Sequence, residues 1–435
     1  MRLYAIAWRH AIAAAAAALL LAACAATPPT APPDRAFTMA VLPDTQNYMD
    51  YTHQKAEGFP FDAHDQFMAQ MRYIAGNVES AGGEIAFVSS LGDVWQHQSL
   101  PIDPEHERRG FRRVPNPIMD AHLGPTPKVQ SVEMPLAREG FALIDGKVPF
   151  SVVPGNHDYD AMWTDARYPP AKNFDPRDLG GLGTLHPGGL DNFRSVFGAD
   201  QPYFEGKPWY VDSHDGGADS AQLFEAAGYR FLHIGLQFDP PDASLEWAAA
   251  VIRRHPGLPT IVSTHDYMSK EGERVANPMI DGHRVDPVHN TPQMVWDKLI
   301  SKHDQVFLVL CGHQHGQAMR VDRNDAGHAV YQVLADYQDR GQTGIEAGVQ
   351  PLGGRIVGIG DGWMRLMRFD FSRATATMTV STYSPHYGKF SGEVPAYAAW
   401  YKQAEQPRLD DAAFLAMDDY RVELGDFRAR FGEPR

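Results

Sequence analysis

The feature that most constrains the fold is a pattern that occurs five times: a short apolar run followed at once by polar residues. Runs of this length, rich in Val, Ile and Phe, predict buried strands. Ligands of open α/β sheets bind beyond the carboxyl ends of the strands, so the five polar clusters are expected to meet at one site. The runs and the residues after them are 38–43 and Asp44, 84–91 and Asp93, 147–154 and Asn156–Asp158, 258–264 and His265, 304–311 and His313–His315.

Helical patterns lie between these runs. Apolar residues at helical spacing predict helices over 64–83 and 244–257, the second with Ser244 as its N-cap. Strand-like runs without intervening helices follow at 328–335, 363–371 and 374–383. This order predicts an α/β fold, a layered α/β/β/α sandwich of two mixed sheets flanked by helices, with a di-metal site at the C-terminal ends of strands.

The length favours one catalytic core with insertions. The chain has 435 residues, whereas a single hydrophobic core stops growing at roughly 250–300 residues. We expect a domain over 37–390 and a helical appendage over 391–435. Two segments at about 96–146 and 159–228 are rich in Pro, Gly, Asp and Arg and lack sustained periodicity. Long irregular segments are usually functional loops, so both are expected to wall the substrate cleft.

The N-terminus has the layout of a secretory signal over residues 1–23. Leu21-Ala22-Ala23-Cys24 resembles the lipobox of bacterial lipoproteins, which implies lipidation of Cys24 and a Pro-rich tether over 24–36. Ala25 rather than Asp follows the cysteine, which in Gram-negative relatives favours the outer membrane, facing the periplasm. Membrane contact is then expected through the N-terminal lipid only. The alternative is an ordinary cleaved signal with an incidental cysteine.

The formal charge is −15, which argues against nucleic acid and anionic membranes as primary partners. An anionic substrate would therefore need local positive charge. Two divalent cations could supply it, and a pair roughly 3.5–4 Å apart needs a bridging ligand and about three further protein ligands each. Asp93, after a glycine, is the natural bridge. His313 and His315 point to the same side of an extended chain, as a clamp on neighbouring ions requires.

At this point a family resemblance appears. The residues Asp44-x-Gln46, Gly92-Asp93, Gly155-Asn156-His157-Asp158, His265 and Gly312-His313-x-His315 resemble the signature of the calcineurin-like metallophosphoesterases. The resemblance implies that Asp44, Asp93 and His315 hold one ion, and that Asp93, Asn156, His265 and His313 hold the other. It further implies hydrolysis of a phosphoester substrate, with a metal-bridging hydroxide as nucleophile and His157 as general acid. Asp158 would orient the His157 ring or cap a helix.

Gln46 departs from the family, which usually has histidine at this position. Gln46 offers either a neutral amide oxygen, which is a harder ligand than imidazole, or only a hydrogen bond to a ligand, so we expect weaker binding at the Asp44 site. We also expect a bias from Zn²⁺ toward Mn²⁺, Mg²⁺ or iron.

Other polar residues have weaker claims on the site. Asn47, His97 and Arg340 are possible substrate-lining residues, although Arg340 also fits a surface ion pair. His233 is expected in the core, and the histidines of the irregular segments in solvent. Monoester and diester hydrolysis remain open, and the rival functions are a catalytically inactive metal-binding scaffold of the envelope and a phosphodiesterase or nuclease.

Overall fold

The computed structural model describes residues 35–173, 179–350 and 358–435. The expected signal peptide, the lipidation site Cys24 and the tether up to residue 34 lie outside the described residues. Among the helices in the described ranges, none combines the length and apolar character needed to span a bilayer.

The first sheet has seven strands, of which β1, β2 and β4 run parallel and the others pair antiparallel. Its strand order is β16-β15-β14-β1-β2-β4, with β17 paired to β15. The strands are β1 (Ala36–Leu42), β2 (Ile85–Ser90), β4 (Phe150–Val152), β14 (Met364–Asp370), β15 (Ala376–Ser384), β16 (Lys389–Phe390) and β17 (Tyr420–Leu424).

The second sheet also has seven strands, in the order β12-β13-β11-β10-β9-β8-β7. Its central strands β13, β11, β10 and β9 are parallel, and the strands at both edges are antiparallel. The strands are β7 (Tyr210–His214), β8 (Asp219–Ala226), β9 (Tyr229–Gly235), β10 (Thr260–Ser263), β11 (Val306–Cys311), β12 (Gly316–Arg323) and β13 (Ala329–Asp336).

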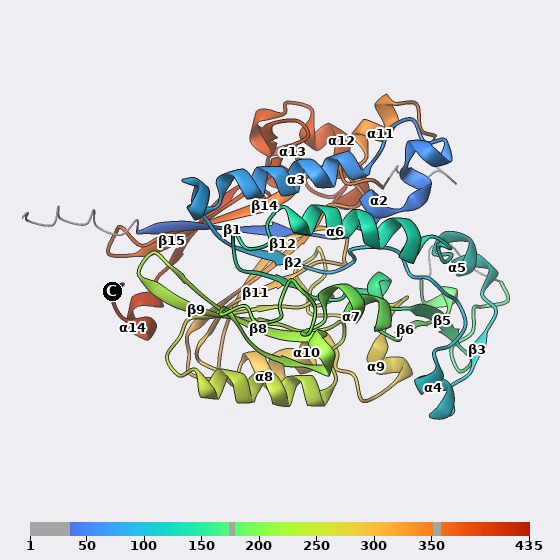
Figure 1. Ribbon diagram of the computed structural model, residues 1–435, viewed down its shortest axis with the longest axis horizontal. Coiled ribbons are helices and arrows are strands. Elements are labelled where there is room, and N and C mark those ends of the chain that lie inside the picture. Colours follow the sequence, from blue (N-terminus) through green and yellow to red (C-terminus); the bar gives the residue numbers. More distant parts are fainter. Residues whose placement is uncertain (1–34, 174–178, 351–357) are drawn as a thin grey trace, which may run out of the picture.

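The helices α3 (His64–Asn77) and α6 (Met134–Ala142) lie on one side of the sheets in Figure 1, and α8 (Asp242–Arg254) lies on the opposite side. A third, small sheet joins β3 (Arg113–Val114), β5 (Ala161–Asp165) and β6 (Leu185–Gly188). The shorter helices are α2 (Gln46–Met49), α4 (Pro104–Arg108), α5 (Pro117–His122), α7 (Asp191–Phe197), α9 (Gly282–Val285), α10 (Pro292–Val295), α11 (Gln342–Glu346), α12 (Tyr397–Glu405), α13 (Asp411–Ala416) and α14 (Phe427–Phe431).

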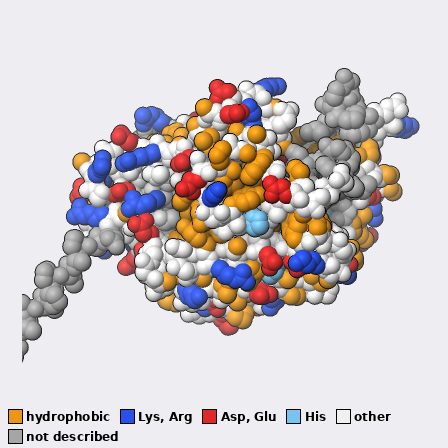
Figure 2. All heavy atoms as spheres, turned by 90° about the horizontal axis from the view of Figure 1, so that it is seen from above, with side chains coloured by type: hydrophobic (Ala, Val, Ile, Leu, Met, Phe, Trp, Pro, Cys, Tyr) orange, Lys and Arg blue, Asp and Glu red, His pale blue; other side chains and the backbone are white. Residues whose placement is uncertain are grey.

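Three apolar clusters account for most of the buried core. The first joins β1, β2 and β4 to α3 and α6, for example through Phe67 and Phe150. The second draws on both large sheets, with Phe37 stacked on Phe369 at 5.0 Å and tilted against Phe231 at 5.1 Å. The third joins the second sheet to α8. On the face above α3, acidic and basic side chains are interspersed around apolar ones (Figure 2).

The structure confirms a mixed α/β fold with two mixed sheets and helices, and all five predicted strands are present. Three details were wrong. Ser244 is not an N-cap: α8 begins at Asp242, and the Ser244 hydroxyl donates to Asp219 at 2.6 Å. The segments 96–146 and 159–228 are not irregular, because the first contains α4, β3, α5 and α6 and the second contains β5, β6, β7 and β8. The appendage 391–435 is only partly helical, because β17 adds a strand to the first sheet.

Candidate metal centre

Five predicted ligands follow the ends of parallel strands, three in the first sheet and two in the second, so they lie at the same edge within each sheet. Glycines let the loops approach each other closely. A Cβ on Gly92 would lie 2.6 Å from the Gly155 amide nitrogen, and one on Gly312 would lie 2.3 Å from Asp44 Oδ2. Gly92 also has a φ of +97°, which only glycine adopts without strain. The glycines before the ligands are therefore a packing requirement of the site.

The backbone is strained at four of the predicted ligands. Asp44, Asp93, His313 and His315 have φ values of +38°, +52°, +69° and +20°. Residues other than glycine seldom occupy this left-handed region, and each instance costs on the order of 1–3 kcal/mol. These four are half of the eight non-glycine residues with positive φ in the described chain, a concentration that fits a functional site.

Asp93, His265 and His313 form a buried group that could hold a metal ion, because each offers a ligand atom within 4.8 Å of the others. His265 Nε2 lies 3.3 Å from Asp93 Oδ1 and 3.1 Å from Asn156 Oδ1. His265 Nδ1 lies 2.7 Å from the Leu91 carbonyl oxygen. A carbonyl only accepts, so Nδ1 carries the hydrogen and Nε2 is directed at the carboxylate, as in histidine ligands of metals.

Unpaired atoms at the same place fit a cation. Asp44 Oδ2 and His313 Nε2 are buried and have no hydrogen-bond partner among the described residues. Asp44 Oδ1 lies 3.8 Å from His265 Nε2 and accepts from the His313 amide at 3.1 Å. Buried polar atoms rarely remain unsatisfied, so a carboxylate oxygen and an imidazole nitrogen left in this state fit a bound ion.

The charges of the group are strongly coupled. Burial, together with the charge of Asp336, raises the pKa of Asp44 well above its usual value. Burial would also raise the pKa of Asp93, but His265 and His157 outweigh it and hold that pKa well below the usual range. Burial would lower the pKa of His265, yet Asp93 and Asp44 raise it to about 10. Cations would relieve this crowding of carboxylates.

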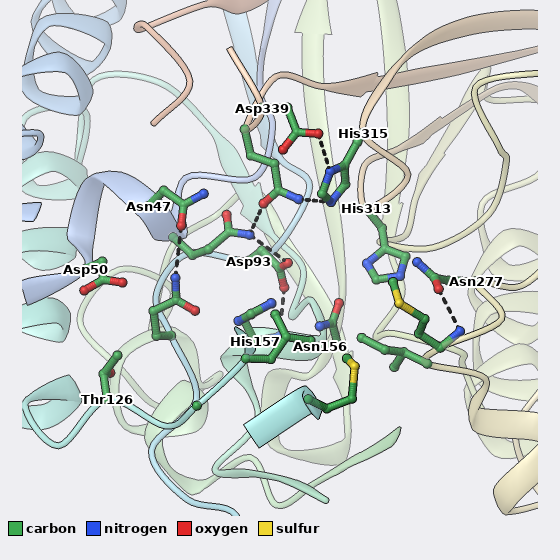
Figure 3. Close-up of a pocket in the computed structure, with 18 of the residues that line it drawn as sticks. Asn47, Asp50, Asp93, Thr126, Asn156, His157, Asn277, His313, His315 and Asp339 are labelled. Carbon is green, nitrogen blue, oxygen red and sulfur yellow. Dashed lines mark hydrogen bonds and ion pairs between the residues drawn. The ribbon is translucent and has the colours of Figure 1, made fainter. Parts of the chain in front are cut away.

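His315 and Gln46 lie in a hydrogen-bonded network beside this group (Figure 3). His315 Nδ1 lies 2.7 Å from Asp339 Oδ2, and its Nε2 contacts the amide of Gln338. The Gln46 amide nitrogen donates to Asp93 Oδ2 at 3.2 Å and to the oxygen of Gln338. The Gln46 amide therefore presents its nitrogen, not its oxygen, to Asp93.

His157 lines the pocket, as a residue over the substrate must. Its backbone amide donates to Asp93 Oδ1 at 2.8 Å, and burial lowers the pKa of its imidazole. Asp158 does not orient the His157 ring. It does cap the short helix Asn156–Asp158, as the third residue of a capping box whose N-cap is Gly155. Its Oδ1 accepts from Val94 N at 2.8 Å and its Oδ2 from Gly155 N at 2.8 Å, so it ties the loop of Asp93 to the loop of Asn156.

The pocket has a volume of about 710 Å³ and combines the centre with the insertions. Ile118, Met119 and Leu123 come from the segment 96–146, and Leu182 from 159–228, so both segments do line it. The predicted site residues Gln46, Asn47, Asp93, Asn156, His157, His313 and His315 also line it. The described lining includes no Lys or Arg, so histidines such as His157 and His315 are the basic side chains in it.

Two predicted substrate-lining residues lie elsewhere. His97 is buried, with its ring centroid 5.8 Å from that of His157, and burial lowers its pKa to about 3. Arg340 is neither in the pocket nor in a surface ion pair. It is fully buried, with Nε 2.7 Å from Glu405 and a terminal nitrogen 3.1 Å from Asp418. A single charged residue gives no local sign of such distant partners.

The sequence reading missed several polar residues of the site. Asp336 accepts from the His315 amide at 3.0 Å, and Asp50 and Asp339 line the pocket. Asp336 ends β13, which is parallel to β11. Asp336 follows the apolar run 328–335, so the expectation that polar residues at strand ends form the site could have included it.

Comparison with known proteins adds little about function. No protein-family model matches the chain. The chain is similar to the uncharacterized protein YvnB of Bacillus subtilis (strain 168), with 24% identity over 245 residues. This match covers 55% of the present chain and 14% of that protein.

Proposed function

We propose that this chain is a binuclear metal-dependent hydrolase of phosphoesters, of the calcineurin-like metallophosphoesterase type. The observation that carries the proposal is the convergence of Asp93, His265 and His313 from three separate strand ends, within 4.8 Å of one another. Asn156 and Asp44 lie against the same group at 3.1 Å and 3.8 Å from His265 Nε2. Carboxylate, amide and imidazole ligands together suit Mn²⁺, Fe, Zn²⁺ or Mg²⁺.

The second ion of the proposed pair would lie between Asp44, Asp93 and His315. Asp93 has two oxygens and would serve both ions. For this to happen, His315 must turn its Nε2 from the amide of Gln338 toward Asp44, while Asp339 keeps its hold on Nδ1. The carboxylate behind Nδ1 is the support that a ligating histidine needs.

Bound cations would activate water and offset the negative charge of the phosphoryl group. The chain itself places the substrate. His157 projects into the pocket from the loop that Asp158 fixes, where its imidazole can pass a proton to the leaving oxygen. Burial lowers the pKa of His157, so a phosphate oxygen beside the ring is needed to favour its protonated form. The apolar wall of Ile118, Met119 and Leu182 would exclude water from one side.

The finer architecture also belongs to this proposal. The three apolar clusters, between helices and the first sheet, between the two sheets, and between the second sheet and α8, support a layered α/β/β/α sandwich. Export and lipid anchoring at Cys24 are proposed from the sequence alone.

The test is hydrolysis of nitrophenyl phosphate and bis(nitrophenyl) phosphate by the full chain with added Mn²⁺. We expect turnover, loss of at least about 100-fold in kcat for His157→Gln with metal content retained, and loss of both metal and turnover for Asp93→Asn. Asp145→Asn is the matched control, because it also replaces a carboxylate with an amide but lies outside the pocket lining. Turnover that survives Asp93→Asn would refute the proposal.

The rival function is a metal-binding scaffold without catalysis. The pocket favours the hydrolase, because His157 lies in it with an imidazole that a scaffold would not require. A chain that binds metal at Asp93 and His265 but hydrolyses neither ester, nor a wider panel of monoesters and diesters, would favour the scaffold.

A further inference from the structure

A second cluster of histidines lies away from the candidate centre. His106 comes from α4, His186 from β6, and His289 from the loop after α9, and each offers a ligand atom within 4.8 Å of the others. His106 Nε2 lies 3.0 Å from His186 Nε2, and the rings of His186 and His289 are 5.3 Å apart. His289 is half-buried. His106 and His186 are buried, which corrects the expectation that histidines of the segments 96–146 and 159–228 face solvent.

Two of these rings are held in the way that metal ligands are held. His106 Nδ1 lies 2.7 Å from the Asp103 carboxylate, and His289 Nδ1 lies 2.7 Å from the Asp239 carbonyl oxygen. Both partners only accept, so each Nδ1 carries the hydrogen and each Nε2 presents a lone pair. A carboxylate or carbonyl behind a histidine, with the other nitrogen free to bind, is the usual support of an imidazole ligand.

The third ring has no competing partner of this kind. His186 faces His106 through Nε2, and its Nδ1 has no hydrogen-bond partner among the described residues. Burial and the neighbouring His289 lower the pKa of His186 well below its usual value, and burial also lowers that of His289.

The charges around the cluster are mixed. Asp286 Oδ2 lies 3.9 Å from His106 Nε2 and could add an oxygen ligand, while Arg109 pairs with it at 2.5 Å. A carboxylate already neutralised by arginine attracts a cation weakly, so the imidazoles must supply most of the affinity. Nitrogen ligands of this kind select Zn²⁺ and similar transition ions over Mg²⁺ or Ca²⁺.

The position of the cluster gives such an ion a structural role. In Figure 1, α4, the small sheet and α9 lie at one end of the molecule. Each histidine belongs to a segment that also lines the pocket: Met119 follows His106, Leu182 precedes His186, and Ile280 precedes His289. Leu185 and Ile280 already form an isolated bridge between two of these segments. An ion here would join all three.

We propose that His106, His186 and His289 bind one structural Zn²⁺ that fastens the insertions forming the pocket wall. The proposal does not depend on the hydrolase assignment. The alternative is a group of hydrogen-bonded core histidines without a metal, in which His186 Nε2 donates to His106 Nε2.

The test is metal analysis of the full chain after equilibration with Zn²⁺ and removal of loosely bound ions. The double variant Asp93→Asn, His265→Ala is used so that zinc bound at the candidate metal centre does not contribute to the measured zinc content. In that background we expect about one equivalent of Zn²⁺ per chain, lost on further change of His186→Ala or His289→Gln and retained with His255→Ala, a half-buried histidine outside both clusters. Cobalt substitution should give the visible spectrum of a nitrogen-ligated site, absent from the His289→Gln chain.

If His186→Ala does not fold, His289→Gln still tests the same site, because His289 is less buried and its substitution should disturb the fold less. Failure of the hydrolase proposal would appear as a chain that retains this equivalent but shows no turnover. Zn²⁺ content unchanged by His289→Gln, or no bound zinc in the double-variant background, would overturn the inference and leave the group of hydrogen-bonded histidines.

Discussion

Arg340→Met should be among the most destabilising changes in the chain. The guanidinium is fully buried and donates to both oxygens of Glu405, at 2.7 Å and 2.9 Å, and to Asp418 at 3.1 Å and Gln317 at 2.7 Å. Methionine fills much of the volume but leaves Glu405 without its cation, whereas Asp418 keeps Arg365 at 3.0 Å. Breaking a buried pair by removing one partner costs about 3–5 kcal/mol, so we expect that loss in the free energy of unfolding.

The loss should grow with pH. Burial raises the pKa of Glu405 to about 7, even with Arg340 opposing that rise. Without Arg340 the pKa of Glu405 rises further, so the folded variant holds a proton that the unfolded chain has released. Its free energy of unfolding then falls by up to about 1.4 kcal/mol per pH unit above pH 7, while this group contributes no such slope in the parent. The gap between variant and parent therefore widens from pH 6 to pH 9.

Urea unfolding followed by circular dichroism at pH 6, 7.5 and 9 measures both effects. Arg368→Met is the matched control, because Arg368 pairs with Glu84 at 2.9 Å on the exposed surface, where a pair contributes about 0–1 kcal/mol. A cost for Arg340→Met as small as that of the control, or a stability difference that narrows as pH rises, would show that Glu405 is not left buried without a partner.

Three further changes probe the candidate centre. Gln46→His should raise metal content and shift preference toward Zn²⁺, because imidazole replaces an amide at the Asp44 site; elemental analysis unchanged by the substitution would contradict this. Asp158→Asn should destabilise the fold by about 1–3 kcal/mol, because an amide NH₂ cannot accept from the Gly155 amide; full stability in urea would argue against its clamping role. Gly312→Ala should reduce metal binding, measured by calorimetry, because a Cβ would lie 2.3 Å from Asp44 Oδ2.

Much of the site could be predicted because its signals are local. An apolar run predicts a strand, and the polar residue after it predicts which side chain lies at the end of that strand. Asp93, His265 and His313 were therefore predicted without tertiary information. The strands β7 and β8 were missed because polar residues such as Asp212, Ser220 and Gln222 interrupt their apolar pattern. Ser220 and Gln222 are buried by strands elsewhere in the sheet, which no local window contains.

Other features were invisible because their partners are far away in sequence. Arg340 meets Glu405 and Asp418 across 65 and 78 residues. His106 meets His186 across 80 residues, inside segments without periodicity. An isolated charged or imidazole side chain is read as exposed by default, since burial without a partner would be too costly. Only the fold shows that the partner exists.

The strained backbone of the site requires support, and two clamps provide it on different sides. Four ligand positions in the left-handed region would each relax at a gain on the order of 1–3 kcal/mol if their surroundings allowed it. Asp158 holds the Asp93 loop to the Asn156 loop through three backbone amides. Arg340, anchored on the C-terminal segment, follows Asp336, whose carboxylate accepts from the His315 amide at 3.0 Å. Glu405 and Asp418, from the segment after residue 390, therefore anchor the chain four residues beyond Asp336.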